Sequence, residues 1–221
     1  RARKARMQVL LDFHYSDDWA DGEKQIIPAA WAGITDPNEL AQAMYDFTLR
    51  TLRELDREGL MPELVQVGNE TNGEILSTLE RAKQPIDWTR NARLFNAGIR
   101  AVREAGKRSS IQPRVMLHIA QPENVESWFA AANAAGVTDF DLIGISYYKR
   151  WSTQDLDGLD AVIRRMRQQF KADVIVVEAA YPWTLENADQ SSNLLSTNTL
   201  IAGYPATQDG QRRYLIDLTQ R

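Results

Sequence analysis

The sequence contains no cysteine and only two histidines among its 221 residues. The missing thiols exclude disulfide bonds and thiolate chemistry, and they say little about the cellular compartment. Metal-dependent hydrolases usually need several histidine and carboxylate ligands. Neither His-x-His nor His-Glu-x-x-His, two common metal-binding spacings, occurs in the sequence. We therefore expect no catalytic metal.

Long apolar runs and an excess of basic charge are missing as well. No apolar stretch approaches the length of a membrane span, and the formal net charge is −4 without a basic run. Nucleic acids and anionic membranes are therefore poor partner candidates. The hydrophobic fraction of 43% is enough for one sizeable core, and the chain is too short for two large domains.

Five short apolar runs predict buried strands, because strands covered on both faces read as nearly continuous apolar stretches. They lie at residues 7–13, 64–67, 115–119, 141–148 and 174–178. Helical patterns separate them, and their expected N-terminal residues are Asp36, Asp87 and Pro122. Glycines stand where these helices should end, at Gly59, Gly106 and Gly136. A further helix is expected over about 208–219.

This alternation of strands and helices predicts an α/β fold with a parallel sheet covered by helices. The glycine-rich signatures of nucleotide-binding doubly wound sheets are absent. An eight-stranded (β/α)8 TIM barrel is the better interpretation, although only five strands are present. We expect residues 1–221 to form a single, partial barrel domain that is truncated at both ends.

Two of the predicted strands end in glutamate, at Glu70 and Glu178. One strand-end glutamate alone could equally be a solvated loop residue, so the pair carries the argument. In a barrel both carboxyl groups project into the same mouth. Hydrolysis of a glycosidic bond with retention needs one carboxyl as acid and another as nucleophile, roughly 5 to 5.5 Å apart.

Aromatic residues gather near the same strand ends. Their faces suit the apolar C–H surfaces of sugar rings, although we expect about half of them to serve as core and rim packing, since aromatics have large burial energies. The candidates are Trp19, Trp31, Tyr147, Tyr148, Trp151, Tyr181 and Trp183.

Several motifs together resemble glycoside hydrolase family 53, the arabinogalactan endo-β-1,4-galactanases of clan A. They are LLDFHYSDDWAD (10–21), QVGNE (66–70), LFNAGIRAV (94–102), GISYY (144–148) and VVEAAYPWT (176–184). The resemblance implies a (β/α)8 barrel in which the five strands are the third to the seventh. It also implies a retaining, endo-acting hydrolase of β-1,4-galactan, the side chain of type I pectin.

The resemblance further implies a role for each site residue. Glu70 is the acid/base and Glu178 the nucleophile, and Asn69 hydrogen-bonds the 2-hydroxyl of the sugar in the −1 subsite. Tyr147 is the candidate for orienting Glu178, with Tyr148 as a close alternative because the strand phase is open. The residues expected to line the −1 region or a flanking subsite are His14, Trp183 and Trp151.

Some members of the resembling family hold a structural calcium in the loop after the seventh strand. Asp189, Ser191 and Asn193 offer oxygen ligands there, but such loops are polar in any case, and we expect no required cofactor. The resemblance implies a polysaccharide substrate and an extracellular or periplasmic location. We expect a monomer without nucleic-acid partners or membrane insertion.

Two alternatives stay open. The same barrel could act on another β-linked polysaccharide, such as a β-mannan or β-glucan, because Ile75-Leu76-Ser77 and Lys149-Arg150 depart from the family pattern in the substrate cleft. The chain could also be a non-catalytic carbohydrate-binding fragment, since five strands leave sheet edges unpaired and cannot close a barrel. We expect the 221-residue segment alone to be unstable or inactive.

Overall fold

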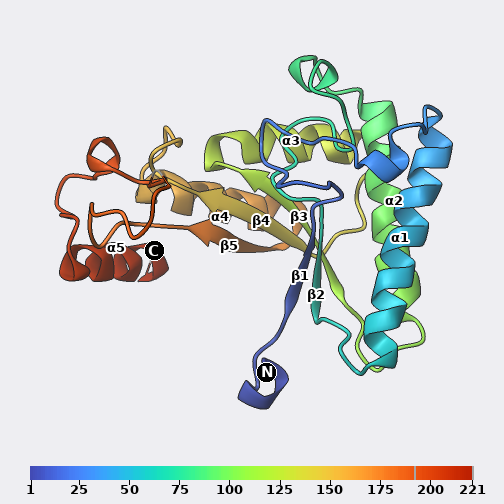
Figure 1. Cartoon of the computed structure of the whole chain (residues 1–221), viewed down its shortest axis with the longest axis horizontal. Coiled ribbons are helices and arrows are strands. Elements are labelled where there is room, and N and C mark those ends of the chain that lie inside the picture. Colours follow the sequence, from blue (N-terminus) through green and yellow to red (C-terminus); the bar gives the residue numbers. More distant parts are fainter. Residues whose placement is uncertain (192, 221) are drawn as a thin grey trace.

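A computed structural model describes residues 1–191 and 193–220, and Figure 1 shows its arrangement. The described strands form one parallel sheet in the order β1-β2-β3-β4-β5, so each strand pairs with its neighbour in sequence. Their bounds are β1 Leu10–Phe13, β2 Leu64–Val67, β3 Arg114–Ala120, β4 Leu142–Tyr147 and β5 Asp173–Ala179. The predicted α/β fold with a parallel sheet is confirmed.

Helices connect successive strands, because parallel neighbours need a crossover connection. The α-helices are α1 Pro37–Arg57, α2 Trp88–Gly106, α3 Pro122–Ala134, α4 Leu156–Phe170 and α5 Gln208–Gln220. Short 3₁₀ helices are η1 Arg3–Ala5, η2 Ala29–Trp31, η3 Arg81–Lys83 and η4 Thr197–Thr199. Helices α1 and α2 run side by side along the β1–β2 end of the sheet, and α5 lies at the opposite end (Figure 1).

The helix ends follow from local chemistry. The Asp36 carboxylate accepts a hydrogen bond from the N–H of Asn38, and the Asp87 carboxylate caps α2 in the same way. Gly59 has a φ of +67° just after α1, a conformation that glycine adopts without steric cost. Gly106 is the last residue of α2 rather than the residue after it. The predicted helices are therefore confirmed, with small shifts at their ends.

One face of the sheet is apolar and packs against the helices. Val67 of β2 is fully buried there, and a side chain at Gly98 of α2 would place its Cβ 2.7 Å from a methyl carbon of Val67. Glycine at position 98 therefore permits the close approach of α2 to the sheet. Other fully buried side chains of the strands are Val65, Val115, Leu117, Ile119, Ile143 and Ile145.

The opposite face of the sheet carries polar groups. Because side chains alternate along a strand, every second residue points away from the helices. The polar residues of this face are Asp12, Gln66, His118, Ser146 and Glu178, one from each strand. A Cβ at Gly144 of β4 would lie 3.3 Å from the Cβ of His118, so this glycine makes room for the imidazole.

No described helix combines the length and apolar composition that crossing a bilayer requires.

Candidate active site

Glu70 follows β2 on a backbone that is held in an uncommon conformation. Its φ is +45°, in the left-handed region that costs energy for a residue with a side chain. Its N–H donates to His118 Nδ1 at 3.3 Å, and the Gln25 amide donates to the carbonyls of Asn69 at 2.7 Å and Glu70 at 3.2 Å. These hydrogen bonds hold the backbone from which the Glu70 side chain projects.

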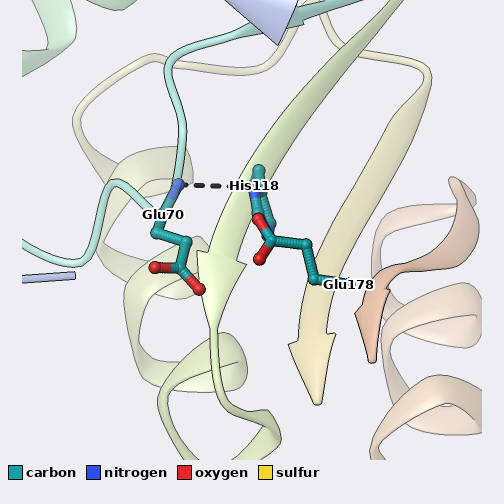
Figure 2. Close-up of side chains that lie close together, drawn as sticks. All are labelled: Glu70, His118 and Glu178. Atoms are coloured by element: carbon teal, nitrogen blue, oxygen red, sulfur yellow. Dashed lines mark hydrogen bonds between the residues drawn. The ribbon is translucent and has the colours of Figure 1, made fainter. Parts of the chain in front are cut away.

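Glu178 lies on β5, opposite Ser146 of β4. Atoms of Glu70, His118 and Glu178, one from each side chain, all lie within 4.8 Å of one another. Figure 2 shows both carboxyl groups reaching into the same space beside β3. The sequence predicted that these two carboxyl groups face each other, and an oxygen of each does lie within 4.8 Å of an oxygen of the other, a short spacing of the kind that retention requires.

The surroundings favour the protonated form of Glu70. Burial raises the pKa of its carboxyl group, and the negative charge of Glu178 raises it further, while a hydrogen bond from Ser146 acts in the opposite direction. Together these effects raise the pKa of the Glu70 carboxyl group above its ordinary value. A carboxyl group whose pKa is raised is suited to act as a general acid near neutral pH.

Tyr148 is the residue that contacts Glu178. Its hydroxyl donates to Glu178 Oε2 at 3.0 Å. Burial, followed by the charge of Glu178, raises the pKa of the Tyr148 phenol, so it stays a hydrogen-bond donor. Tyr147 instead points to the helix layer, is 1% exposed, and donates to the carbonyl of Gln154 at 3.2 Å.

The prediction that Tyr147 orients Glu178 is therefore wrong, and the alternative, Tyr148, makes the contact. The reason is the two-residue alternation of the strand. Ser146 faces His118 on the polar side of the sheet, so Tyr148 shares that side and Tyr147 does not. Against β5 the register shifts between Ile145 and Ser146, so Ser146 pairs with Glu178 and Val177 is skipped, which brings Glu178 to the side of Ser146 and Tyr148.

Asn69 is buried beside the acid. Its Nδ2 donates to the carbonyl of Ala20 at 2.8 Å, and its Oδ1 accepts from Gln66 Nε2 at 3.3 Å. The same Oδ1 lies 3.0 Å from His118 Nδ1. One N–H of the Asn69 amide has no partner among the described residues, since a primary amide carries two.

His14 follows β1 with both ring nitrogens occupied. Nδ1 accepts from the N–H of Ala20 at 3.0 Å, and Nε2 lies 3.2 Å from Asp12 Oδ2. Burial raises the pKa of the Asp12 carboxyl group despite this histidine. Trp19, 77% exposed, stands edge-on to the His14 ring at 5.6 Å between ring centroids. The structure therefore places His14 at the polar edge of the site.

The predicted aromatic residues divide into two groups. Trp151 is 46% exposed and meets the ring of Tyr148 edge-on at 5.4 Å, so it lies beside the tyrosine that contacts Glu178. Trp183, in the loop after β5, is 54% exposed. Tyr181 is buried and stacks on Tyr214 at 4.5 Å, as a core residue does.

Two residues of the site were not singled out from the sequence. Ser146 hydrogen-bonds both His118 and Glu70, and its signal was its place two residues before Tyr148 on the polar side of β4. Gln25 lies in a loop without periodicity, so no sequence pattern pointed to it.

The described residues contain one group that could offer three ligand atoms to a metal ion, namely Glu70, His118 and Glu178. Both ring nitrogens of His118 already take part in hydrogen bonds. In the loop after β5, Asp189 Oδ1 accepts from the N–H of Ser191 at 2.8 Å, and Asn193 Nδ2 lies 3.4 Å from the carbonyl oxygen of Glu186. These contacts are those of an ordinary polar loop.

A parallel βα sheet that presents two close glutamates at the carboxyl ends of its strands has the architecture of the barrel glycoside hydrolases. The family model described as Glycosyl hydrolase family 53 matches residues 1–221. The chain belongs to this family, which confirms the resemblance stated from its motifs.

Individual relatives agree with the family assignment. The chain is 50% identical over its whole length to an arabinogalactan endo-beta-1,4-galactanase of Cellvibrio japonicus, and it covers 59% of that protein. It is 35% identical to an endo-beta-1,4-galactanase of Bacillus subtilis, and it covers 49% of that protein. The solved catalytic domain of an Ignisphaera aggregans family 53 protein matches 98% of the chain with a TM-score of 0.87 and 32% identity, and the chain covers 59% of it. The chain thus spans about half to three fifths of these relatives.

Proposed function

We propose that the protein containing this chain is a retaining, endo-acting hydrolase of β-1,4-linked galactan. The observation that carries the proposal is the pair of carboxyl groups from Glu70 and Glu178, close enough to act on one anomeric carbon. The substrate class is supported by family membership and by relatives whose names state endo-β-1,4-galactanase activity. In this proposal β1 to β5 are the third to seventh strands of a (β/α)8 barrel.

The reaction proceeds in two displacements. Glu70 protonates the leaving glycosidic oxygen while the carboxylate of Glu178 attacks the anomeric carbon and forms a covalent glycosyl-enzyme. Glu70, now ionised, then takes a proton from water as the water attacks the same carbon and releases Glu178. Tyr148 holds Glu178 Oε2, which leaves the other carboxylate oxygen free to attack.

The surrounding residues bind the sugar chain. Asn69 offers its remaining amide N–H to the 2-hydroxyl of the reacting sugar, an interaction that strengthens in the transition state. The exposed rings of Trp151, beside Tyr148, and of Trp183, in the loop after β5, offer stacking faces for sugar rings, and His14 borders the site from β1. Tyr147 contributes through the core, since it has no access to the pocket.

The decisive experiment is hydrolysis of β-1,4-galactan by the full-length protein beside Glu70→Gln and Glu178→Gln. We expect both variants to lose at least about 10²-fold in kcat, as removal of a positioned acid or nucleophile does. NMR of the first products should show the β-anomer, which retention requires. Variants as active as the parent, or an α-anomer formed first, would contradict the proposal. A panel with β-mannan and β-glucan checks the choice of glycan.

Further parts of the proposal concern the protein as a whole. No metal ion is needed in the mechanism above, and we propose no cofactor. Action on a plant polysaccharide, the galactan side chain of pectin, suits a monomer that is secreted or periplasmic. These statements rest on the substrate class and on family membership.

A further inference from the structure

A chain of buried hydrogen bonds joins His118, Ser146 and the carboxyl group of Glu70. His118 and Ser146 come from neighbouring strands and are both fully buried. His118 Nε2 lies 2.8 Å from Ser146 Oγ, a ring nitrogen of His118 lies within 4.8 Å of a Glu70 carboxyl oxygen, and hydrogen bonding by Ser146 lowers the pKa of that carboxyl group. The backbone N–H of Glu70 returns to the same imidazole at Nδ1 (Figure 2).

The hydrogen-bond donors around the imidazole determine its tautomer. Two N–H groups point at Nδ1, from the backbone of Glu70 at 3.3 Å and from Gln66 Nε2 at 3.1 Å. The direction of the Glu70 backbone N–H is fixed by the chain, so we assign Nδ1 as an acceptor and place the ring proton on Nε2. Asn69 Oδ1, 3.0 Å from Nδ1, then accepts from Gln66 Nε2 rather than from the ring. Burial lowers the pKa of His118 to about 3, which keeps the ring neutral.

The tautomer in turn sets the direction of the serine. With Nε2–H donating, Ser146 Oγ accepts from His118, and its single O–H is left to donate to the Glu70 carboxylate. With the opposite tautomer, Nδ1–H would donate to Asn69 Oδ1 at 3.0 Å and the serine proton would be drawn to Nε2. Glu70 would then lose its donor.

We propose that His118, neutral and protonated on Nε2, orients the hydroxyl of Ser146 so that it donates to Glu70 and holds this carboxyl group in line with the leaving oxygen. His118 and Ser146 are thus positioning residues for the acid/base. This assignment rests on the proposed function of Glu70 as the acid/base. It extends that function with two residues, His118 and Ser146, that act on Glu70 without touching the substrate.

The hydrogen bond from Ser146 matters because burial and the nearby carboxylates destabilise the ionised form of Glu70. Glu70 must become a carboxylate after it protonates the leaving group and must stay one until water attacks. The titratable groups that face it from the surrounding segments are Asp12, Asp21, His118, Tyr148 and Glu178. Asp12, Asp21 and Glu178 carry carboxyl groups, whose negative charge disfavours ionisation of Glu70. The serine hydroxyl supplies a hydrogen-bond donor that offsets this effect.

The test compares Ser146→Ala with Ser109→Ala in the full-length protein. The Ser109 hydroxyl also hydrogen-bonds a carboxylate, Asp56 Oδ1 at 2.6 Å, but it lies in the loop between α2 and β3, at the end of the sheet away from Glu70, so its loss is a matched control. We expect Ser146→Ala to lose about tenfold or more in kcat/KM on galactan, the effect of one hydrogen bond to a charged group. We expect Ser109→Ala to match the parent.

Two readouts separate positioning from a general loss of structure. A dinitrophenyl galactobioside has a leaving group that needs no protonation, so Ser146→Ala should impair its cleavage far less than that of galactan. The basic limb of the kcat/KM profile, which follows deprotonation of Glu70, should move to higher pH. Equal losses on both substrates together with an unmoved basic limb would overturn the proposal.

The histidine is tested by ¹⁵N NMR and by two substitutions. The ring nitrogens of His118 should show the Nε2–H tautomer, and an Nδ1–H tautomer would refute the proposal. His118→Gln keeps a donor near Ser146 and should retain more galactan activity than His118→Leu. A parent inactive on galactan would instead count against the proposed function, whereas an active parent with an unaffected Ser146→Ala variant counts only against this inference.

Discussion

The hydrogen bond from Tyr148 to Glu178 gives the sharpest prediction about activity. The change is Tyr148→Phe, which removes one hydroxyl and leaves the ring that packs against Trp151. The bond is 3.0 Å long and its acceptor is a carboxylate. Hydrogen bonds to charged groups contribute about 1.5 to 3 kcal/mol. At about 1.4 kcal/mol for each tenfold in rate, we expect kcat on galactan to fall by about 10-fold to about 150-fold.

The neighbouring tyrosine supplies the matched control, Tyr147→Phe. Its hydroxyl donates to the carbonyl of Gln154, which also accepts from Lys149 Nζ at 3.1 Å. The carbonyl therefore keeps a partner, and we expect at most about 1 kcal/mol of lost stability with unchanged kcat. The assay is steady-state galactan hydrolysis, with thermal unfolding to confirm folding. If Tyr147→Phe lost activity and Tyr148→Phe did not, the assignment of the tyrosines to the two faces of β4 would be refuted.

Two further predictions follow from the charges around the site. Glu178→Gln removes the negative charge that adds to the raised pKa of Glu70, so we expect this pKa to fall, as measured by ¹³C NMR of the labelled carboxyl; an unchanged or higher pKa would mean that the two groups do not interact. Glu74, which is buried and ion-paired with Arg81, has a pKa that burial raises but the hydrogen bonds of Arg81 and Asp87 lower below the ordinary 4.5. Its contribution to stability is therefore present above this pH and lost as the pH falls through the depressed value. We expect Glu74→Gln to lower the free energy of unfolding at pH 7 by about 1 to 2 kcal/mol in urea titrations, less than for a fully buried pair because Arg81 is 44% exposed. A loss within error of zero would show that the pair is not needed.

The sequence alone determined the elements and the chemistry at their ends. Apolar runs produce buried strands, and residues such as Asp36 and Asp87 start helices through hydrogen bonds to N–H groups two or three positions away. These are short-range effects, so a sequence pattern predicts them well. The two strand-end glutamates were predictable for a related reason, since the carboxyl ends of parallel strands meet at one edge.

The tertiary structure alone decided which side chains meet within that edge. Strand phase settled the choice between Tyr147 and Tyr148, and a shift of one residue would have reversed it. The partners of Glu70 come from positions 25, 118 and 146, which only the paired strands and a loop bring together. Hydrogen bonds between groups so far apart in the chain depend on register, twist and loop path, and no local pattern in the sequence records these.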